Sequence, residues 1–361
     1  MLYKDLEITL HKASPEQKRK KPDQDKLGFG VHFSDHMFTA RWNREKGWHE
    51  AEIKPYQDFV LDPAAMVFHY GQAIFEGLKA YRGKDGQVLL FRPKDNLERL
   101  NRSALRMCMP RIPVDRILQA LKALVYLDRE WIPEAEGATL YIRPTMVATE
   151  PALGLRPADE YLFFIINSPV GAYYSEGFNP VKIYVEDTYV RAVPGGVGEA
   201  KTAGNYAASV KALTEAQKKG YTQVLWLDAI ERRYIEEVGT SNIFFVLGDE
   251  LVTPPISGTI LPGITRDSVL QLARDWGLKV AERPVTIDEI IEAAENSTLK
   301  EAFGTGTAAV ISPVGELCYK DRNIVINNGQ TGELSKRFFD ELQALQRGFR
   351  DDVHNWVVRV G

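Results

Sequence analysis

Cysteine is scarce in this 361-residue sequence, and its scarcity limits what the protein can be. The two cysteines, Cys108 and Cys318, lie far apart and form no C-x-x-C pair. Small secreted domains and zinc modules depend on several closely spaced cysteines. We therefore expect no disulfide framework and no zinc site, and we expect a reducing compartment such as the cytoplasm.

Long apolar runs are also missing. No stretch approaches the ~20 residues that a helix needs to cross a bilayer. The N-terminus, Met1–Leu10, carries charged residues where a signal peptide would be apolar. We therefore expect no membrane partner.

A charge excess of one sign is absent too, because the formal net charge is only -4. The short basic run Lys18–Lys21 lacks interleaved aromatic residues and is flanked by acidic ones. Such runs usually form a solvated surface. The sequence thus favours no nucleic-acid partner.

Nucleotide and metal motifs are absent as well. The segment Gly195–Gly198 lacks the G-x-G-x-x-G spacing of a dinucleotide site, and no G-x-x-x-x-G-K-[ST] occurs. No H-E-x-x-H is present, and the six histidines are scattered. We expect no metal site, and a nicotinamide dehydrogenase has no support.

Helical and strand patterns mix along the chain without regular βαβ alternation, which is typical of an α+β fold. Helical spacing of apolar residues starts at Asp95 and recurs in four further segments. The predicted helices are 95–105, 115–131, 205–219, 265–277 and 287–296. The predicted strands are 140–146, 161–167, 181–186, 224–227 and 243–246.

The length suggests two domains, at roughly 100–200 residues per domain. The stretch Ser168–Pro180 is rich in Pro, Gly and Ser, which is typical of a linker. We place an N-terminal domain at 1–170, a linker at 171–182 and a C-terminal domain at 183–361.

Lys201 is the first candidate for chemistry. It lies among small residues in Gly198–Tyr206, just ahead of a predicted helix. Small neighbours let a planar group approach the backbone, and a buried lysine is a nucleophile for carbonyl carbon. This segment taken alone favours the simpler interpretation, a surface lysine at a helix start.

Glu237 strengthens the interpretation that Lys201 binds a cofactor. A pyridinium ring that acts as an electron sink needs a carboxylate partner on its nitrogen, and Glu237 can supply one. Thr240 and the turn around it offer a hydroxyl and backbone N–H groups. The alternative is that Glu237 caps a turn.

Two segments are rich in backbone N–H donors. The first, Gly258–Asp267, is predicted to be a loop that enters a helix N-terminus, a good seat for a phosphate. The second, Gly304–Ala309, is a small-residue turn that can hold a phosphate or a carboxylate.

The order of these segments resembles the class IV aminotransferases. The resemblance rests on Glu237-x-x-x-x-Asn242 followed by the Leu261–Arg266 string. A wider match to the branched-chain-amino-acid aminotransferases covers nearly the whole chain. It includes Phe68–Ala80, Tyr141–Thr145, the Lys201 segment and Gly306–Ala308.

The resemblance implies a fold-type IV enzyme with pyridoxal 5'-phosphate. Its smaller N-terminal α/β domain and larger C-terminal domain, with a pseudo-barrel of strands, would hold the cofactor at their interface. Lys201 matches the catalytic Schiff-base lysine. The remaining cofactor-binding positions implied are Arg99, Tyr206, Glu237, Thr240, Ile264, Thr265 and Thr307.

The substrates implied are leucine, isoleucine, valine and their 2-oxo acids, with 2-oxoglutarate as acceptor in a ping-pong reaction. Arg143 would help to bind the second carboxylate of glutamate. Leu153 and Leu155 match a loop that reaches the site of a second subunit, which implies a homodimer. The full set of implied substrate contacts is Tyr70, Phe75, Tyr141, Arg143, Leu153, Leu155, Thr307 and Ala308.

Other functions remain open at this point. D-amino-acid aminotransferase and aminodeoxychorismate lyase share the fold and would keep Lys201 and Glu237. The Tyr141–Thr145 string, the Phe75–Gly77 string and the chain length favour the branched-chain enzyme. A cofactor-binding protein without activity is a further alternative, although both key residues are present.

Overall fold

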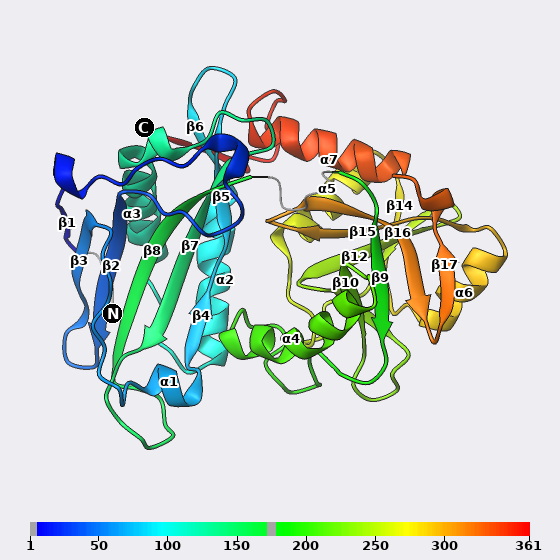
Figure 1. Ribbon diagram of the computed structural model, residues 1–361, viewed down its shortest axis with the longest axis horizontal. Helices are drawn as coiled ribbons and strands as arrows, with labels where there is room; N and C mark the ends of the chain where they lie inside the picture. Colours follow the sequence, from blue (N-terminus) through cyan, green and yellow to red (C-terminus); the bar gives the residue numbers. More distant parts are fainter. Residues whose placement is uncertain (1–5, 172–177) are drawn as a thin grey trace. The chain divides into compact units, whose positions relative to one another are not determined.

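The computed structural model describes residues 6–171 and 178–361. The chain divides into two compact units (Figure 1). The first comprises Met1–Tyr173, Ala200–Ala203 and Ala344–Gly361, and the second comprises Tyr174–Glu199 and Gly204–Gln343.

The first unit is built on one sheet with the strand order β1-β3-β2-β8-β7-β5-β6-β18, and β4 pairs with β7. Only β1 is parallel to its neighbour. The strands are β1 (Ile8–Leu10), β2 (His36–Asn43), β3 (Gly47–Pro55), β4 (Ala73–Phe75), β5 (Leu78–Arg82), β6 (Val88–Phe91), β7 (Thr139–Ala148), β8 (Glu160–Val170) and β18 (Val357–Val360). The helices are α1 (Met66–Tyr70), α2 (Pro93–Arg106) and α3 (Val114–Leu127), with short 3-10 turns at Pro15–Gln17, Gln24–Lys26 and Arg129–Trp131.

Helix α2 shows how the sequence pattern becomes packing. Pro93 occupies its first turn, where a missing N–H costs nothing, and Leu97, Leu100 and Ala104 are fully buried in the core of the unit. The helical pattern predicted from Asp95 is confirmed. The buried face also carries Arg99, so this helix delivers a cation into the interior.

The second unit contains a closed barrel. Its strand order is β11-β10-β9-β16-β15-β12-β13-β14, and β12 also pairs with β11, which closes six strands into a ring. The strands are β9 (Val181–Glu186), β10 (Gln223–Leu227), β11 (Ile235–Val238), β12 (Ser241–Leu247), β13 (Glu250–Thr253), β14 (Lys279–Glu282), β15 (Leu299–Gly306), β16 (Val310–Tyr319) and β17 (Arg322–Val325). The helices are α4 (Ala203–Lys218), α5 (Ile264–Asp275), α6 (Ile287–Glu295) and α7 (Glu333–Gln346), with a 3-10 turn at Asn327–Gly329. The expected α+β class with a barrel in the C-terminal part is confirmed.

The units do not follow linear boundaries at 1–170, 171–182 and 183–361. The C-terminal segment joins the first unit because β18 pairs with β6. Ala200–Ala203 joins it too, because Thr202 forms a β-bridge with Ile74. Part of the predicted linker, residues 172–177, lies outside the described residues.

One predicted helix is interrupted. The segment expected as a single helix, 115–131, ends its α-helical part at Leu127 and continues as the 3-10 turn Arg129–Trp131. Asp128, between them, has non-helical backbone angles.

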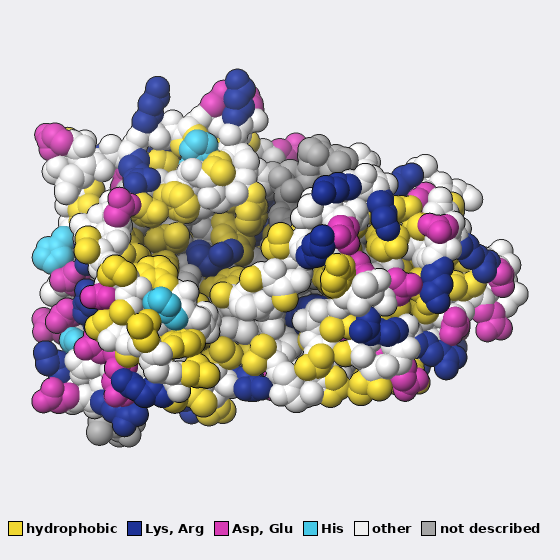
Figure 2. Space-filling model, turned by 60° about the horizontal axis from the view of Figure 1, so that its bottom comes forward, with side chains coloured by type: hydrophobic (Ala, Val, Ile, Leu, Met, Phe, Trp, Pro, Cys, Tyr) yellow, Lys and Arg dark blue, Asp and Glu magenta, His cyan; other side chains and the backbone are white. Residues whose placement is uncertain are grey.

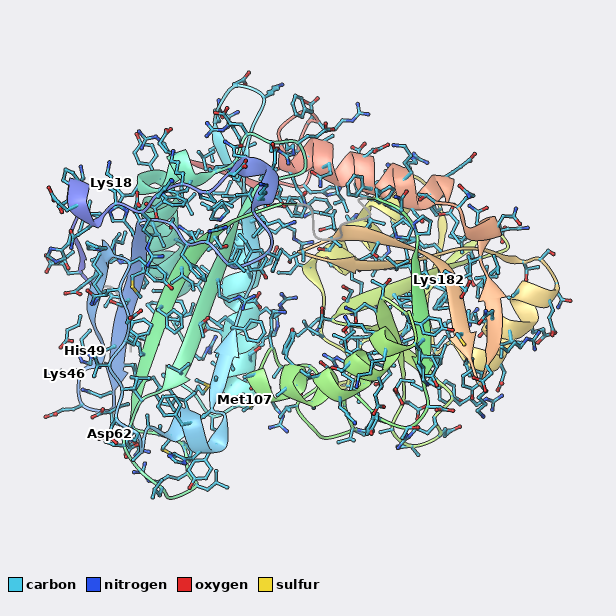
Figure 3. The ribbon with its side chains drawn as sticks, in the orientation of Figure 1. Lys18, Lys46, His49, Asp62, Met107 and Lys182 are labelled. Carbon is cyan, nitrogen blue, oxygen red and sulfur yellow. The ribbon has the colours of Figure 1, made fainter. Side chains whose placement is uncertain are left out.

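Acidic and basic side chains are interspersed on the face that Figure 2 shows. Lys18, in the short basic run, is exposed on the N-terminal segment (Figure 3). Among residues 6–171 and 178–361, no helix is long and apolar enough to span a membrane.

Candidate active site

Lys201 is held by its backbone in the first unit. Its N–H donates to Ser103 Oγ at 2.9 Å, and its carbonyl accepts the Phe75 N–H at 3.0 Å. The next residue, Thr202, donates its hydroxyl to the Ala73 carbonyl at 2.8 Å. The side chain is half-buried, and its Nζ lies 5.0 Å from the centre of the Phe75 ring. The backbone is thus fixed on both sides of a lysine whose amine lies over an aromatic wall.

Arg143 and Tyr141 lie beside the same aromatic wall. The Arg143 guanidinium is 4.8 Å from the centre of the Phe75 ring, and its Nη2 lies 3.4 Å from the Tyr141 hydroxyl. Phe29, which sequence reasoning missed, packs edge-on against Tyr141 with ring centres 5.0 Å apart. A Cβ at Gly77 would lie 1.9 Å from the Tyr141 hydroxyl. Lys201, Phe75, Tyr141 and Arg143 therefore meet as a group, and Gly77 leaves room for the tyrosine.

Arg99 forms a buried ion pair with Glu76. Two guanidinium nitrogens lie 2.7 and 2.9 Å from the Glu76 carboxylate, and Asn96 donates to the same group at 2.8 Å. Burial by itself raises the pKa of Glu76, but Arg99, with Lys201 and Asn96, outweighs it, so the pKa lies below the ordinary value. Glu76 therefore stays ionised and orients Arg99. The phosphate-binding role of Arg99 stays a prediction.

Tyr70 and the Leu153 loop form a separate contact in the first unit. The Tyr70 hydroxyl donates to the Leu153 carbonyl. The side chains of Leu153 and Leu155 are exposed, at 68% and 81%.

Glu237 lies in the second unit, in strand β11. It is 2% exposed, and its Oε2 lies 2.5 Å from Nε of Arg191. Its strand partner Asn242 donates to Oε1 at 3.0 Å and to the Leu261 carbonyl at 3.0 Å. A cation and an amide that both bond a buried carboxylate hold it in one position and favour its ionised form.

Arg191 is itself fixed by backbone carbonyls. Its Nη1 donates to the Thr259 carbonyl at 2.7 Å and its Nη2 to the Gly198 carbonyl at 3.2 Å. A Cβ at Gly198 would lie 2.4 Å from the Thr259 oxygen and 2.6 Å from Ala192 Cβ. Glycine at this position therefore lets the Gly-rich segment lie against Thr259 and Ala192. No sequence motif pointed to this arginine.

Tyr206 and Thr240, two of the predicted cofactor residues, meet in the second unit. They line a small pocket together with Arg191, Gly239 and Leu261. Thr240 directly follows the tight turn at Gly239, whose φ is +56°. Tyr206, Thr240 and Arg191, the ion-pair partner of Glu237, therefore line one pocket.

The first N–H-rich segment takes the predicted form of a loop that enters a helix, but the turn predicted over 304–309 is wrong in its first half, because Gly304–Gly306 end strand β15 and only 307–309 form the turn. Helix α5 begins at Ile264, and its N-cap Gly263 makes no side-chain capping bond. A Cβ at Gly263 would lie 1.9 Å from Asn242 Oδ1, so glycine is needed for close packing. Thr307 and Ala308 form the turn that follows β15. A helix N-terminus without a cap is suited to a phosphate.

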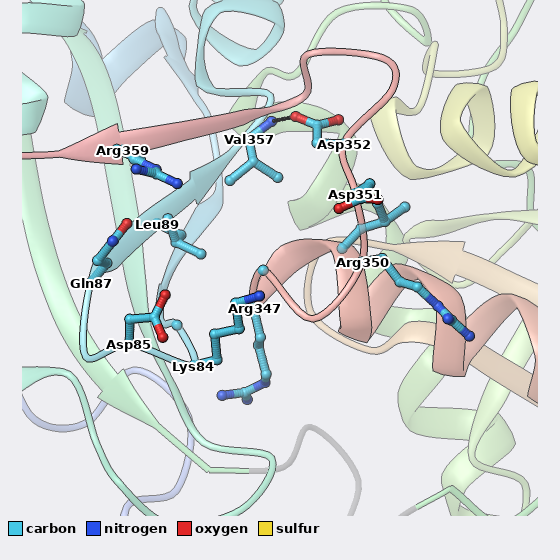
Figure 4. Close-up of a pocket in the computed structure, with 13 residues that line it drawn as sticks. Lys84, Asp85, Gln87, Leu89, Arg347, Arg350, Asp351, Asp352, Val357 and Arg359 are labelled. Carbon is cyan, nitrogen blue, oxygen red and sulfur yellow. Dashed lines mark hydrogen bonds between the residues drawn. The ribbon is translucent and has the colours of Figure 1, made fainter.

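The part of the chain that the structure describes holds no group of three or more His, Cys, Asp or Glu residues placed to bind a metal ion. Another pocket of the first unit, between the β5–β6 hairpin and the C-terminal segment, carries charges of both signs (Figure 4). Its Asp352 accepts the backbone N–H groups of Trp356 and Val357. This pocket shares no residue with the groups above.

A pyridine cofactor fits the donors that each unit offers. The first unit supplies a lysine on a fixed backbone beside Phe75. The second supplies a buried, ion-paired carboxylate and an uncapped helix N-terminus beside glycines that have no room for a Cβ. These groups match an amine-reactive carbonyl, a ring nitrogen and a phosphate.

Comparison with known proteins points in the same direction. The model of the family described as "Amino-transferase class IV" matches residues 73–317 of this chain. Branched-chain-amino-acid aminotransferase 2 of Bacillus subtilis is 55% identical over 343 residues, which cover 95% of this chain and 94% of the relative. The branched-chain amino acid aminotransferase of Escherichia coli matches with a TM-score of 0.77 at 27% identity, covering 91% of this chain and 99% of that one. The enzyme of Thermobaculum terrenum in its PLP form matches with a TM-score of 0.72 at 27% identity, covering 91% and 98%.

Proposed function

Since this chain belongs to the class IV aminotransferases and, within them, to the branched-chain-amino-acid aminotransferases, we propose the following reaction and roles. The enzyme transfers the amino group of leucine, isoleucine or valine to 2-oxoglutarate, with pyridoxal 5'-phosphate as cofactor. The bound cofactor withdraws electrons from the substrate carbon. The observation that supports the proposal best is Lys201 with its backbone bonded on both sides, in a chain 55% identical to such an enzyme.

Lys201 and Glu237 have complementary roles. Lys201 holds the cofactor and, once displaced by substrate, moves the proton of the substrate α-carbon as general acid–base. Glu237, kept ionised by Arg191, holds a proton on the ring nitrogen. Arg99, Tyr206, Thr240, Ile264, Thr265 and Thr307 bind the rest of the cofactor.

Phe75 and Tyr70 form the apolar wall for the substrate side chain, and Thr307 with Ala308 bind its α-carboxylate. Arg143, beside Tyr141, accepts the second carboxylate of glutamate. An apolar pocket can accept a carboxylate only if a cation pairs with it.

The proposal extends to assembly and location. The exposed Leu153 and Leu155 reach a second copy of the chain, so the enzyme is a homodimer. Scarce cysteine supports a cytoplasmic enzyme.

Lys201→Ala tests the central assignment. We expect the visible absorbance of the lysine–cofactor linkage to disappear and turnover of L-leucine to be nearly lost. Lys211→Ala is a matched control, since Lys211 is an exposed lysine of α4 that forms an ion pair with Glu215. Normal turnover in the Lys201 variant would refute the assignment, and turnover of D-alanine in place of L-leucine would favour the D-amino-acid enzyme.

Arg143→Met tests substrate choice. We expect kcat/KM for glutamate to fall at least about tenfold more than for leucine, since ~1.4 kcal/mol of lost pairing corresponds to that ratio. Arg102→Met, on the exposed side of α2, is the control. Equal losses for the two substrates would contradict the role of Arg143.

A further inference from the structure

A short segment ahead of the first long strand, residues 23–30, reaches one of the candidate substrate residues. We call this segment the strap. Its aromatic residue, Phe29, lies edge-on against the Tyr141 ring, with ring centres 5.0 Å apart and an angle of 63° between the rings. Tyr141 is 9% exposed and Phe29 is 36% exposed, so Phe29 is the outer partner of the pair. Edge-on aromatic contacts of this kind favour one relative position of the two rings.

The backbone of the strap turns sharply at Phe29. The glycines on either side, Gly28 and Gly30, have φ of +59° and +72°, a region that residues with a Cβ avoid. The Gly28 carbonyl accepts the Gly171 N–H at 3.1 Å, and Leu27 is 3% exposed. One backbone hydrogen bond and one buried side chain therefore fix the strap just before Phe29.

Gln24 holds the other end of the strap. Its side-chain Oε1 accepts two backbone N–H groups, from Glu134 at 2.8 Å and from Ala135 at 3.0 Å. Since both partners are donors, the amide oxygen and not the NH₂ group must face them. The residues that Gln24 bonds lie directly ahead of β7, the strand that carries Tyr141. Gln24 therefore ties the strap to the segment that enters this strand.

Tyr141 in turn contributes to the orientation of Arg143. The Arg143 Nη2 lies 3.4 Å from the Tyr141 hydroxyl, and the guanidinium carbon is 5.3 Å from the centre of the tyrosine ring. The Arg143 Nε is buried and has no hydrogen-bond partner among the described residues. A guanidinium binds a carboxylate through two parallel hydrogen bonds only when its plane is correctly oriented. A shift of Tyr141 therefore changes how Arg143 can bind a carboxylate.

We propose that Gln24 is a positioning residue for substrate choice: through the strap and Phe29 it holds Tyr141 where Arg143 can bind the second carboxylate of glutamate. Gln24 acts through other residues and is not catalytic. Leucine has no second carboxylate, so its turnover depends less on this geometry. The inference rests on the proposed function, in which Arg143 binds that carboxylate.

The bonds of Gln24 serve position more than stability. Gln24 and Glu134 are exposed, and both hydrogen bonds lie at the surface. Water replaces a surface hydrogen bond at little cost in stability, but it does not fix the distance between two chain segments. Loss of Gln24 should therefore appear in the kinetics, with the midpoint of unfolding unchanged.

Two substitutions of Gln24 test this role. Gln24→Leu removes the acceptor, and we expect kcat/KM for glutamate to fall about three- to tenfold relative to leucine, the range that an edge-on aromatic contact supplies. The loss should lie in KM for glutamate rather than in kcat. Gln24→Glu should match the wild type, because a carboxylate also accepts both N–H groups. Gln17→Leu is the matched control, since the Gln17 side chain bonds Ser14 within its own turn.

A double-mutant cycle tests whether Gln24 acts through Phe29. Phe29→Ala should by itself lower kcat/KM for glutamate. In that background, Gln24→Leu should change the ratio of the two substrates by less than about twofold, because its route to Tyr141 is already lost. Full multiplication of the two losses would overturn the inference.

Hydrogen exchange measures the position of the strap without any turnover. Gln24→Leu should speed exchange of the Gly171 amide, which the Gly28 carbonyl protects, while amides in α2 keep their wild-type rates. Gln24→Glu should leave the Gly171 amide protected. Wild-type exchange at Gly171 in Gln24→Leu would show that Gln24 does not hold the strap.

The outcomes separate this inference from the proposed function. An unchanged substrate ratio in Gln24→Leu, equal losses for both substrates, or failure of Gln24→Glu to match the wild type would overturn the role of Gln24. If leucine is still transaminated with a Lys201-dependent absorbance, only that role is wrong. If the wild type transaminates neither leucine nor glutamate, the proposed function is wrong and the inference fails with it.

Discussion

Glu76→Gln should destabilise the first unit strongly. Glu76 is fully buried and is bonded by two nitrogens of Arg99 and by Asn96. The substitution keeps the shape of the side chain but removes its charge, so the buried Arg99 loses its counter-ion. Loss of one partner from a buried ion pair costs about 3–5 kcal/mol, and we expect the lower end because glutamine still accepts a hydrogen bond.

The same prediction has a pH dependence. Because the pKa of Glu76 is lowered in the folded protein, its contribution is complete above the unfolded-state value of about 4.3 and is lost as pH falls through the folded value. The stability difference between wild type and variant should therefore be constant near neutrality. It should shrink only below about pH 4.

Native-state hydrogen exchange of amides in α2, which carries Arg99 and Asn96, measures the effect within the first unit. Asp340→Asn is the control, since it removes only the exposed pair with Lys336 and should cost about 0.3–0.5 kcal/mol. An unfolding free energy for Glu76→Gln within ~1 kcal/mol of wild type would refute the view that Arg99 depends on Glu76 as its counter-ion.

Two further substitutions test packing and capping. Gly77→Ala places a Cβ where the Tyr141 hydroxyl lies. We therefore expect kcat/KM to fall for both leucine and glutamate, while the absorbance of the bound cofactor is kept. Unchanged kinetics would show that turnover does not depend on the position of Tyr141. Thr286→Ala removes the hydrogen bond that the Glu289 N–H donates to the Thr286 hydroxyl at the start of α6. It should lower the unfolding free energy of the second unit by about 1 kcal/mol, measured by hydrogen exchange of amides in α6. Thr214→Ala, on the exposed side of α4, is the control.

The local elements followed from local chemistry. The apolar spacing after Asp95 fixed α2, and Gly220 ended α4 near the predicted position. Glycines with no room for a Cβ, such as Gly263 and Gly198, were visible as small-residue segments. These features depend on a few neighbouring residues, so a single sequence contains them.

Functional candidates also came from the sequence, but only as separate segments. The motif of Glu237 and Asn242 placed two residues that β11 and β12 do pair. The roles of Lys201, Glu237 and the phosphate turns came from the order of several motifs and from a family resemblance. The segment around Lys201, taken alone, favoured a surface lysine.

Only the tertiary structure supplied the partners of those candidates. Phe29 reaches Tyr141 from a segment more than a hundred residues away, and Arg191 reaches Glu237 from a loop without a motif. Such contacts are set by packing between distant segments and by burial from water, and neither quantity is written in the spacing of residues along the chain.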